Sequence, residues 1–120
     1  MKKLIPLIAV SFVATAISTS SALAHSELKR STPAAGSTVV APTSLELNFS
    51  DSVNLRFSKV ILTDSGAIEA KIGEPALSED GHTLVVPVSA PLSPGKYVVY
   101  WDALSQDGHK VKGEFRFTVE

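Results

Sequence analysis

Two of the three histidines in the chain stand where they could bind a metal ion. His109 closes an Asp-Gly-His sequence that begins at Asp107, so a carboxylate and an imidazole are two residues apart. In an extended backbone this spacing places both side chains on one face. Gly108 also permits a turn that aims them at the same point. The other histidine, His25, lies far away in the sequence and depends on how the chain begins.

The first 24 residues have the pattern of a secretory signal peptide. Lys2 and Lys3 supply the positive start, an apolar run follows over Leu4–Ile17, and Ala22-Leu23-Ala24 matches the small-x-small cleavage pattern. The apolar run is shorter than the ~20 residues that a membrane-spanning helix needs. We therefore expect cleavage between Ala24 and His25, with residues 1–24 removed and residues 25–120 exported to the periplasm.

After such a cleavage His25 carries a free α-amine, which can chelate a metal together with its own imidazole Nδ1. An α-amine has a pKa of about 8, so a divalent ion must displace a proton to bind it near neutral pH. With Asp107 and His109 the donor set has three nitrogens and one oxygen, which suits tetragonal Cu(II). Soft donors are absent, because there is no cysteine and the only methionine, Met1, leaves with the signal peptide.

Each part of this metal site also has a purely structural interpretation. An isolated Asp-Gly-His is usually a turn, and the chain contains a second copy, Asp80-Gly81-His82. We interpret this second copy as a hairpin turn before a strand near Thr83, because a single histidine without partners seldom makes a specific metal site.

The elements that must position these residues are β-strands. Apolar and polar residues alternate over Leu45–Phe49 and again over Phe115–Val119, which is typical of half-buried strands. Further strands are indicated by β-branched, aromatic or weakly alternating residues over Ser58–Thr63, Ala67–Ile72, Thr83–Val88 and Gly95–Leu104. Turn residues separate them at intervals of about ten residues, so we expect an all-β, antiparallel Greek-key sandwich of about seven strands. Tyr97 and Trp101 share one face and are expected in its core.

Composition limits the remaining possibilities. Residues 25–120 contain nine lysines and arginines against twelve aspartates and glutamates, a formal charge of −3, which makes nucleic acid an unsuitable partner. Ninety-six residues suffice for one domain with one core and leave no room for a second. Without cysteine, the core and the backbone ladders alone must stabilise this exported domain.

Over its whole mature length the chain resembles the CopC/PcoC family of periplasmic copper-resistance proteins. The matching segments are His25, Ser31–Gly36, Leu45–Ser50, Pro94–Tyr97, Trp101, Ser105–His109 and Gly113–Phe115. The resemblance implies an Ig-like or cupredoxin-like β-sandwich in which His25, Asp107 and His109 coordinate Cu(II). Asp51 stands where the family commonly has glutamate, and it could approach the metal from the second shell or simply face solvent. The lack of methionine indicates the subgroup that binds Cu(II) alone.

The resemblance implies a copper chaperone or buffer, not an enzyme, that binds one Cu(II) per chain. It would exchange the ion with an inner-membrane transporter of the CopD type, and we expect a monomer that is not embedded in the membrane. Two alternatives remain open at this stage. One is a copper monooxygenase-like enzyme, which also uses an N-terminal histidine. The other is a metal-free Ig-like accessory module that pairs its strand edges with partners.

Overall fold

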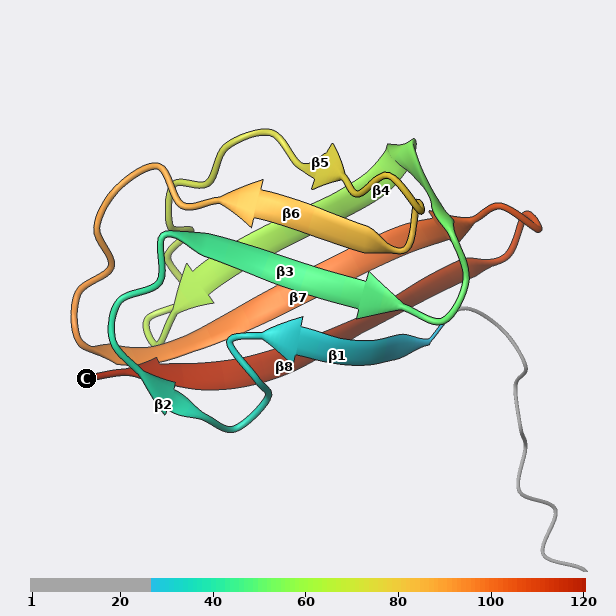
Figure 1. Cartoon of the computed structure of the whole chain (residues 1–120). Helices are drawn as coiled ribbons and strands as arrows, with labels where there is room; N and C mark the ends of the chain where they lie inside the picture. Colours follow the sequence, from blue (N-terminus) through green and yellow to red (C-terminus); the bar gives the residue numbers. More distant parts are fainter. Residues whose placement is uncertain (1–26) are drawn as a thin grey trace, which may run out of the picture.

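Two four-stranded β-sheets pack face to face in the computed structural model, which describes residues 27–120 (Figure 1). One sheet has the strand order β1-β3-β6-β5 and the other has the order β2-β8-β7-β4. In chain order the strands are β1 (Leu28–Thr32), β2 (Thr38–Val39), β3 (Ser44–Phe49), β4 (Val53–Asp64), β5 (Ala76–Leu77), β6 (Thr83–Pro87), β7 (Gly95–Ser105) and β8 (Lys110–Val119). The expected all-β sandwich is confirmed, with eight strands instead of about seven.

The alternation in the sequence is the reason that the two sheets enclose one core. Leu45, Leu47 and Phe49 of β3 are at most 1% exposed, while Glu46 between them faces solvent. The same alternation buries every second residue at the end of β8, from Phe115 to Val119. Neighbouring strands pair antiparallel except β2, which runs parallel to the end of β8. The core therefore lies between the sheets, and the connections lie at the two ends.

The weak alternation over Ala67–Ile72 does not form a strand, so this expectation was wrong. The segment makes only isolated bridges, between Thr63 and Glu69 and between Ile72 and Val88. It begins in a turn in which the Asp64 carboxylate accepts hydrogen bonds from the backbone N–H groups of Gly66 and Ile68. The segment therefore crosses between the two sheets with one bridge to β4 and one to Val88, just after β6.

Four segments meet at one end of the sandwich, on the right in Figure 1. They are the start of β1, the β3–β4 connection, the β5–β6 turn and the β7–β8 turn. Backbone hydrogen bonds join them to the β3–β4 connection: Ser50 N to Glu27 O (2.9 Å), Val53 N to Gly81 O (2.9 Å) and Gln106 N to Ser52 O (3.0 Å). This end holds the two Asp-Gly-His sequences and the point at which the N-terminal segment reaches the domain.

Within residues 27–120 no helix is long and apolar enough to cross a membrane.

Candidate metal centre

The β7–β8 hairpin carries Asp107 and His109 in its turn. Ser105, the last residue of β7, donates its backbone N–H to the His109 carbonyl (2.8 Å), and Gly108 donates back to the Ser105 carbonyl (2.9 Å). Gly108 has a φ of 91°, a conformation that side chains with a Cβ rarely adopt. The two candidate ligands therefore lie in a tight turn closed by two backbone hydrogen bonds, and not on an extended strand.

Within this turn the two side chains contact each other. Asp107 Oδ1 lies 3.0 Å from the backbone N of His109, which donates to it, and 3.1 Å from His109 Nδ1. The turn thus brings the carboxylate and the imidazole together, as the sequence predicts. Both side chains remain open to solvent, with 46% of Asp107 and 55% of His109 exposed. Their role as metal ligands stays a prediction.

The turn also fixes the charge of Asp107. The N–H of His109 lowers the pKa of this carboxyl to about 2, assisted by the imidazole of His109 and the hydroxyl of Ser105. A carboxylate with this pKa is ionised at any pH at which the protein would meet a metal ion. Asp107 therefore offers a permanent negative charge, and a cation does not have to displace a proton from it.

His25 lies outside the described residues, but the residue two positions later is held firmly. Ser50 donates its backbone N–H to the Glu27 carbonyl (2.9 Å), and its hydroxyl accepts the N–H of Glu27 (2.8 Å). A groove of about 880 Å³ runs between the start of β1 and the edge of β8, and both Glu27 and His109 line it. Sequence analysis did not predict the Ser50–Glu27 pair, because its members are 23 residues apart and neither belongs to a ligand motif.

Asp51 lies in the β3–β4 connection, at the same end of the sandwich. Its side chain is exposed, and the carbonyl of the next residue, Ser52, accepts the N–H of Gln106 in the β7–β8 turn. This places Asp51 on the segment that contacts the β7–β8 turn. A second-shell role for its carboxylate stays a prediction.

The second Asp-Gly-His forms the hairpin turn between β5 and β6, as predicted. Asp80 Oδ1 accepts the N–H of His82 (3.0 Å), as in the first copy, but it also accepts the Ser78 hydroxyl (2.6 Å). The hydrogen bond from Ser78, followed by that from the His82 N–H, lowers the pKa of Asp80. Nδ1 of the His82 ring lies 3.1 Å from the Phe49 carbonyl.

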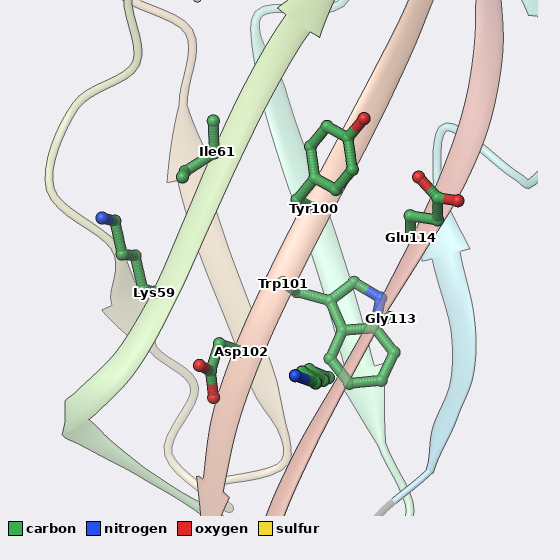
Figure 2. Close-up of a pocket in the computed structure, with 8 residues that line it drawn as sticks. Lys59, Ile61, Tyr100, Trp101, Asp102, Gly113 and Glu114 are labelled. Carbon is green, nitrogen blue, oxygen red and sulfur yellow. The ribbon is translucent and has the colours of Figure 1, made fainter.

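The aromatic residues of β7 pack largely as predicted. Tyr97 is 6% exposed and stacks on Phe117, whereas Trp101 is half-buried and meets the edge of Phe49 with ring centroids 5.4 Å apart. Figure 2 shows the Trp101 indole lying across β8 at Gly113, beside a hollow on the β4-β7-β8 sheet. Trp101 also lines the groove that His109 lines, between the start of β1 and the edge of β8.

No group of three or more potential ligands among His, Cys, Asp and Glu is arranged to hold a metal ion within residues 27–120. In this part of the chain, Asp107 and His109 are a carboxylate and an imidazole that contact each other at the surface.

Comparison with known proteins identifies the family. The family model for the CopC domain matches residues 28–120. Copper resistance protein C of Escherichia coli is 38% identical over 110 residues, covering 83% of this chain and 85% of that protein. Among solved structures, Escherichia coli PcoC, described as a methionine-rich copper resistance protein, has a TM-score of 0.74 at 36% identity, covering 80% of this chain and 99% of that one. CopC from Methylosinus trichosporium OB3b has a TM-score of 0.74 at 31% identity, covering 80% and 94%. This chain belongs to the CopC family.

Proposed function

We propose that this protein is a periplasmic copper-binding protein, a chaperone or buffer, that holds one Cu(II) through His25, Asp107 and His109. The proposal includes removal of residues 1–24, so that His25 becomes the N-terminal residue of a single domain, residues 25–120. The observation that carries it is the Asp107–His109 pair in a turn at the end of the sandwich where Ser50 anchors Glu27. The relatives are named for copper resistance and not for an enzymatic activity, in agreement with the expectation of a protein that is not an enzyme.

Chain geometry allows His25 to reach the turn. Two residues span at most about 7 Å when fully extended, so the Cα of His25 stays within that distance of the anchored Glu27. Glu27 and His109 line the same groove. This shared groove supports a site in which the α-amine and imidazole of His25 meet the Asp107–His109 pair.

The contacts within the turn suggest which atoms face the metal. Asp107 Oδ1 and His109 Nδ1 lie 3.1 Å apart, a separation that allows both atoms to bind one ion, so we expect these two atoms to be the ligands from the turn. Asp51 would accept hydrogen bonds from the outer shell.

The choice of Cu(II) follows from the donors that remain after cleavage. Three nitrogens and one carboxylate oxygen suit Cu(II), whereas Cu(I) prefers thioether and thiolate sulfur. The related PcoC is described as methionine-rich, but here the only methionine is Met1 and cysteine is absent. A Cu(I) site built from sulfur would therefore have no ligands in residues 25–120.

Exposure of the site suits a protein that passes its metal on. About half of each side chain in the Asp107–His109 pair is open to solvent, so ligands of a partner can approach the bound ion before it is released. We propose an inner-membrane copper transporter of the CopD type as that partner, and a monomer as the form that meets it.

The test compares mature protein that begins at His25 with a form extended by one N-terminal residue. The extension converts the α-amine into an amide and leaves every side chain in place. Cu(II) is titrated against a competing chelator while EPR spectra are recorded. We expect one tightly bound Cu(II) with a tetragonal, nitrogen-rich spectrum in the mature form and much weaker binding in the extended form.

The two histidine turns supply matched variants for the same titration. His109→Ala should abolish tight binding, and His82→Ala, which alters the other Asp-Gly-His, should leave it intact. If the mature and extended forms bind weakly and alike, and His109→Ala changes nothing but turn stability, the protein is instead a metal-free accessory module.

A further inference from the structure

We infer that Ser50 is a positioning residue for the N-terminal copper donors. This inference rests on the proposed function, because it concerns how His25 is held near Asp107 and His109. Ser50 follows the last residue of β3 and contacts Glu27, two residues after His25, through both its backbone and its side chain.

The irregular start of β1 makes the Ser50–Glu27 contact important for the direction of the chain before Leu28. β1 pairs with β3 through Leu28 and Phe49, but the register shifts between Leu28 and Arg30. An extra residue in a ladder bends the strand and interrupts its regular hydrogen bonds. Beyond the shift the ladder resumes with the Leu28–Phe49 pair alone and then ends. The two hydrogen bonds between Ser50 and Glu27 are what continue the pairing toward the N-terminus.

Ser50 itself stands on a fixed base. The preceding residue, Phe49, is 1% exposed and meets the Trp101 ring edge-on. Its backbone N–H donates to the His82 carbonyl (2.8 Å), a bond that does not depend on the His82 side chain. The backbone of the second Asp-Gly-His turn thus supports the end of β3, and Ser50 holds Glu27. An anchor of this kind limits how far His25 can move before copper binds.

The chemical consequence is preorganisation of the chelate. Binding that must first order a mobile segment loses affinity in proportion to the freedom that is removed. When the Ser50 hydroxyl holds the Glu27 N–H, part of that ordering is already present in the metal-free protein. Loss of one such hydrogen bond corresponds to about a five- to tenfold change in an equilibrium constant, and this is the loss of Cu(II) affinity that we expect.

The experiment measures Cu(II) affinity and EPR spectra for wild type, Ser50→Ala and Ser50→Thr, each in the mature form and in the form extended by one residue. Ser50→Ala should weaken binding about five- to tenfold in the mature form, broaden the EPR hyperfine lines and speed amide exchange at Glu27. Ser50→Thr keeps the hydroxyl and should bind like wild type. In the extended form, which lacks the α-amine, Ser50→Ala should have little effect.

Ser37→Ala is the matched control. Its hydroxyl donates to the Ala34 carbonyl (2.6 Å), and its own carbonyl accepts the N–H of Thr118, near the opposite end of β8. This variant removes one serine hydroxyl bond away from the candidate site, so its copper affinity should equal that of wild type.

The alternative outcomes separate this inference from the proposed function. If the mature wild type binds tightly and Ser50→Ala binds equally tightly, with unchanged EPR lines, the positioning role is wrong and the copper site stands. If Ser50→Ala weakens the mature and extended forms equally, Ser50 supports only the fold, and the inference again fails. If the mature wild type binds no better than the extended form, the proposed function fails first, and the role of Ser50 fails with it.

Discussion

Asp107 and Asp80 occupy the first position of identical tripeptides, and in both the carboxylate accepts the N–H of the histidine two residues later. They differ in what surrounds them. Asp107 also contacts the ring of its own histidine, whereas Nδ1 of His82 lies 3.1 Å from the Phe49 carbonyl. The same local hydrogen bond thus forms twice, and only one copy aims an imidazole and a carboxylate at the same point.

Asp107→Asn should reduce the stability of the metal-free protein at pH 6 and have less effect at pH 2. The pKa of Asp107 is lowered to about 2 in the folded protein from a usual value of 3.8. A group with a lowered folded pKa stabilises the native state above its unfolded pKa, and that contribution disappears as the pH falls through the folded value. Denaturant midpoints of both proteins at the two pH values test this expectation. Equal midpoints at pH 6 would contradict it.

Asp80→Asn and Asp107→Asn form a matched pair for copper binding. The pKa of Asp80 is also lowered, chiefly by the Ser78 hydroxyl, so both variants should destabilise the metal-free protein in the same direction. If Asp107 binds the metal, Asp107→Asn should weaken Cu(II) binding by at least the roughly 10- to 100-fold that loss of an outer-shell partner already causes. Asp80→Asn should leave it unchanged. A competition titration distinguishes the two, and equal losses would remove Asp107 from the proposed site.

Sequence reasoning at this scale predicted the contact between Asp107 and His109 but missed what supports it. The Asp-Gly-His spacing and the family resemblance were enough to predict that Asp107 and His109 converge. Nothing in the sequence separated Asp80-Gly81-His82 from Asp107-Gly108-His109 except the resemblance. Ser50 could not be found, because its partner Glu27 is distant in sequence and the register shift in β1 leaves no periodic signal.

Among the strands, the β7–β8 hairpin depends on a glycine that permits close packing. A Cβ added at Gly113 would lie 2.6 Å from Trp101 Cζ2, far inside normal contact distance. The indole cannot easily retreat, because its edge-to-face contact with Phe49 holds it on the other side. Gly113 is therefore required on β8 because the Trp101 ring occupies the place of a side chain. The sequence shows the glycine but not the ring that packs on it.

Gly113→Ala should destabilise the protein by about 1–3 kcal/mol, the usual cost of overpacking a filled site. Trp101→Phe removes the ring atoms that would collide, so the double variant Trp101→Phe/Gly113→Ala should cost less than the sum of the two single changes. Chemical unfolding of the four proteins measures this coupling. Additive effects would show that the new methyl group is accommodated without touching the ring.

A serine in β4 closes the irregular part of that strand. Residues 55–58 lie between the pairs Asn54–Leu104 and Lys59–Asp102, where β7 has only Ala103, so β4 contains three extra residues here. The Ser58 hydroxyl donates to the Asn54 carbonyl (2.7 Å) and accepts the Leu104 N–H (3.2 Å), so it bridges the gap. Ser58→Ala should lower the free energy of unfolding by about 1–2 kcal/mol, measured by denaturant titration. An unchanged midpoint would mean that water replaces the hydroxyl at no cost.

The elements that could be predicted are those with enough residues to show a period. β3, β4, β6, β7 and β8 were each indicated by alternation or by β-branched and aromatic runs. β2 and β5 have two residues each, which is too short for any pattern, and β1 is mostly exposed. These three strands form by pairing with longer strands: β1 with β3, β2 with β8 and β5 with β6. Such pairing depends on the assembled sheets and leaves no local sequence pattern.

In the whole molecule, the proposed site would join the two sheets. The N-terminal arm enters through β1, an edge strand of one sheet, whereas Asp107 and His109 belong to the β7–β8 turn of the other. Core packing already holds the sheets together. A metal bound by His25 and His109 would add a direct link at the end where four connections meet.

Cu(II) should therefore raise the unfolding midpoint of the mature protein. A ligand present at 100 times its Kd stabilises the state that binds it by about 2.7 kcal/mol. The extended form should gain much less at the same copper concentration, because it lacks the α-amine. Thermal unfolding of both forms, with and without copper, measures the difference, and the metal-free forms should unfold at similar temperatures. Equal gains in the two forms would mean that copper is held without the N-terminus.

The pH dependence of this stabilisation identifies the groups that release protons. Binding should weaken as the pH falls below about 8, because protons compete with copper for the α-amine. Asp107 should contribute nothing to this slope between pH 8 and pH 5, since its pKa is about 2. In the extended form the part of the slope due to the amine should disappear. If both forms show the same slope, the proton is displaced elsewhere, and His25 does not bind copper through its amine.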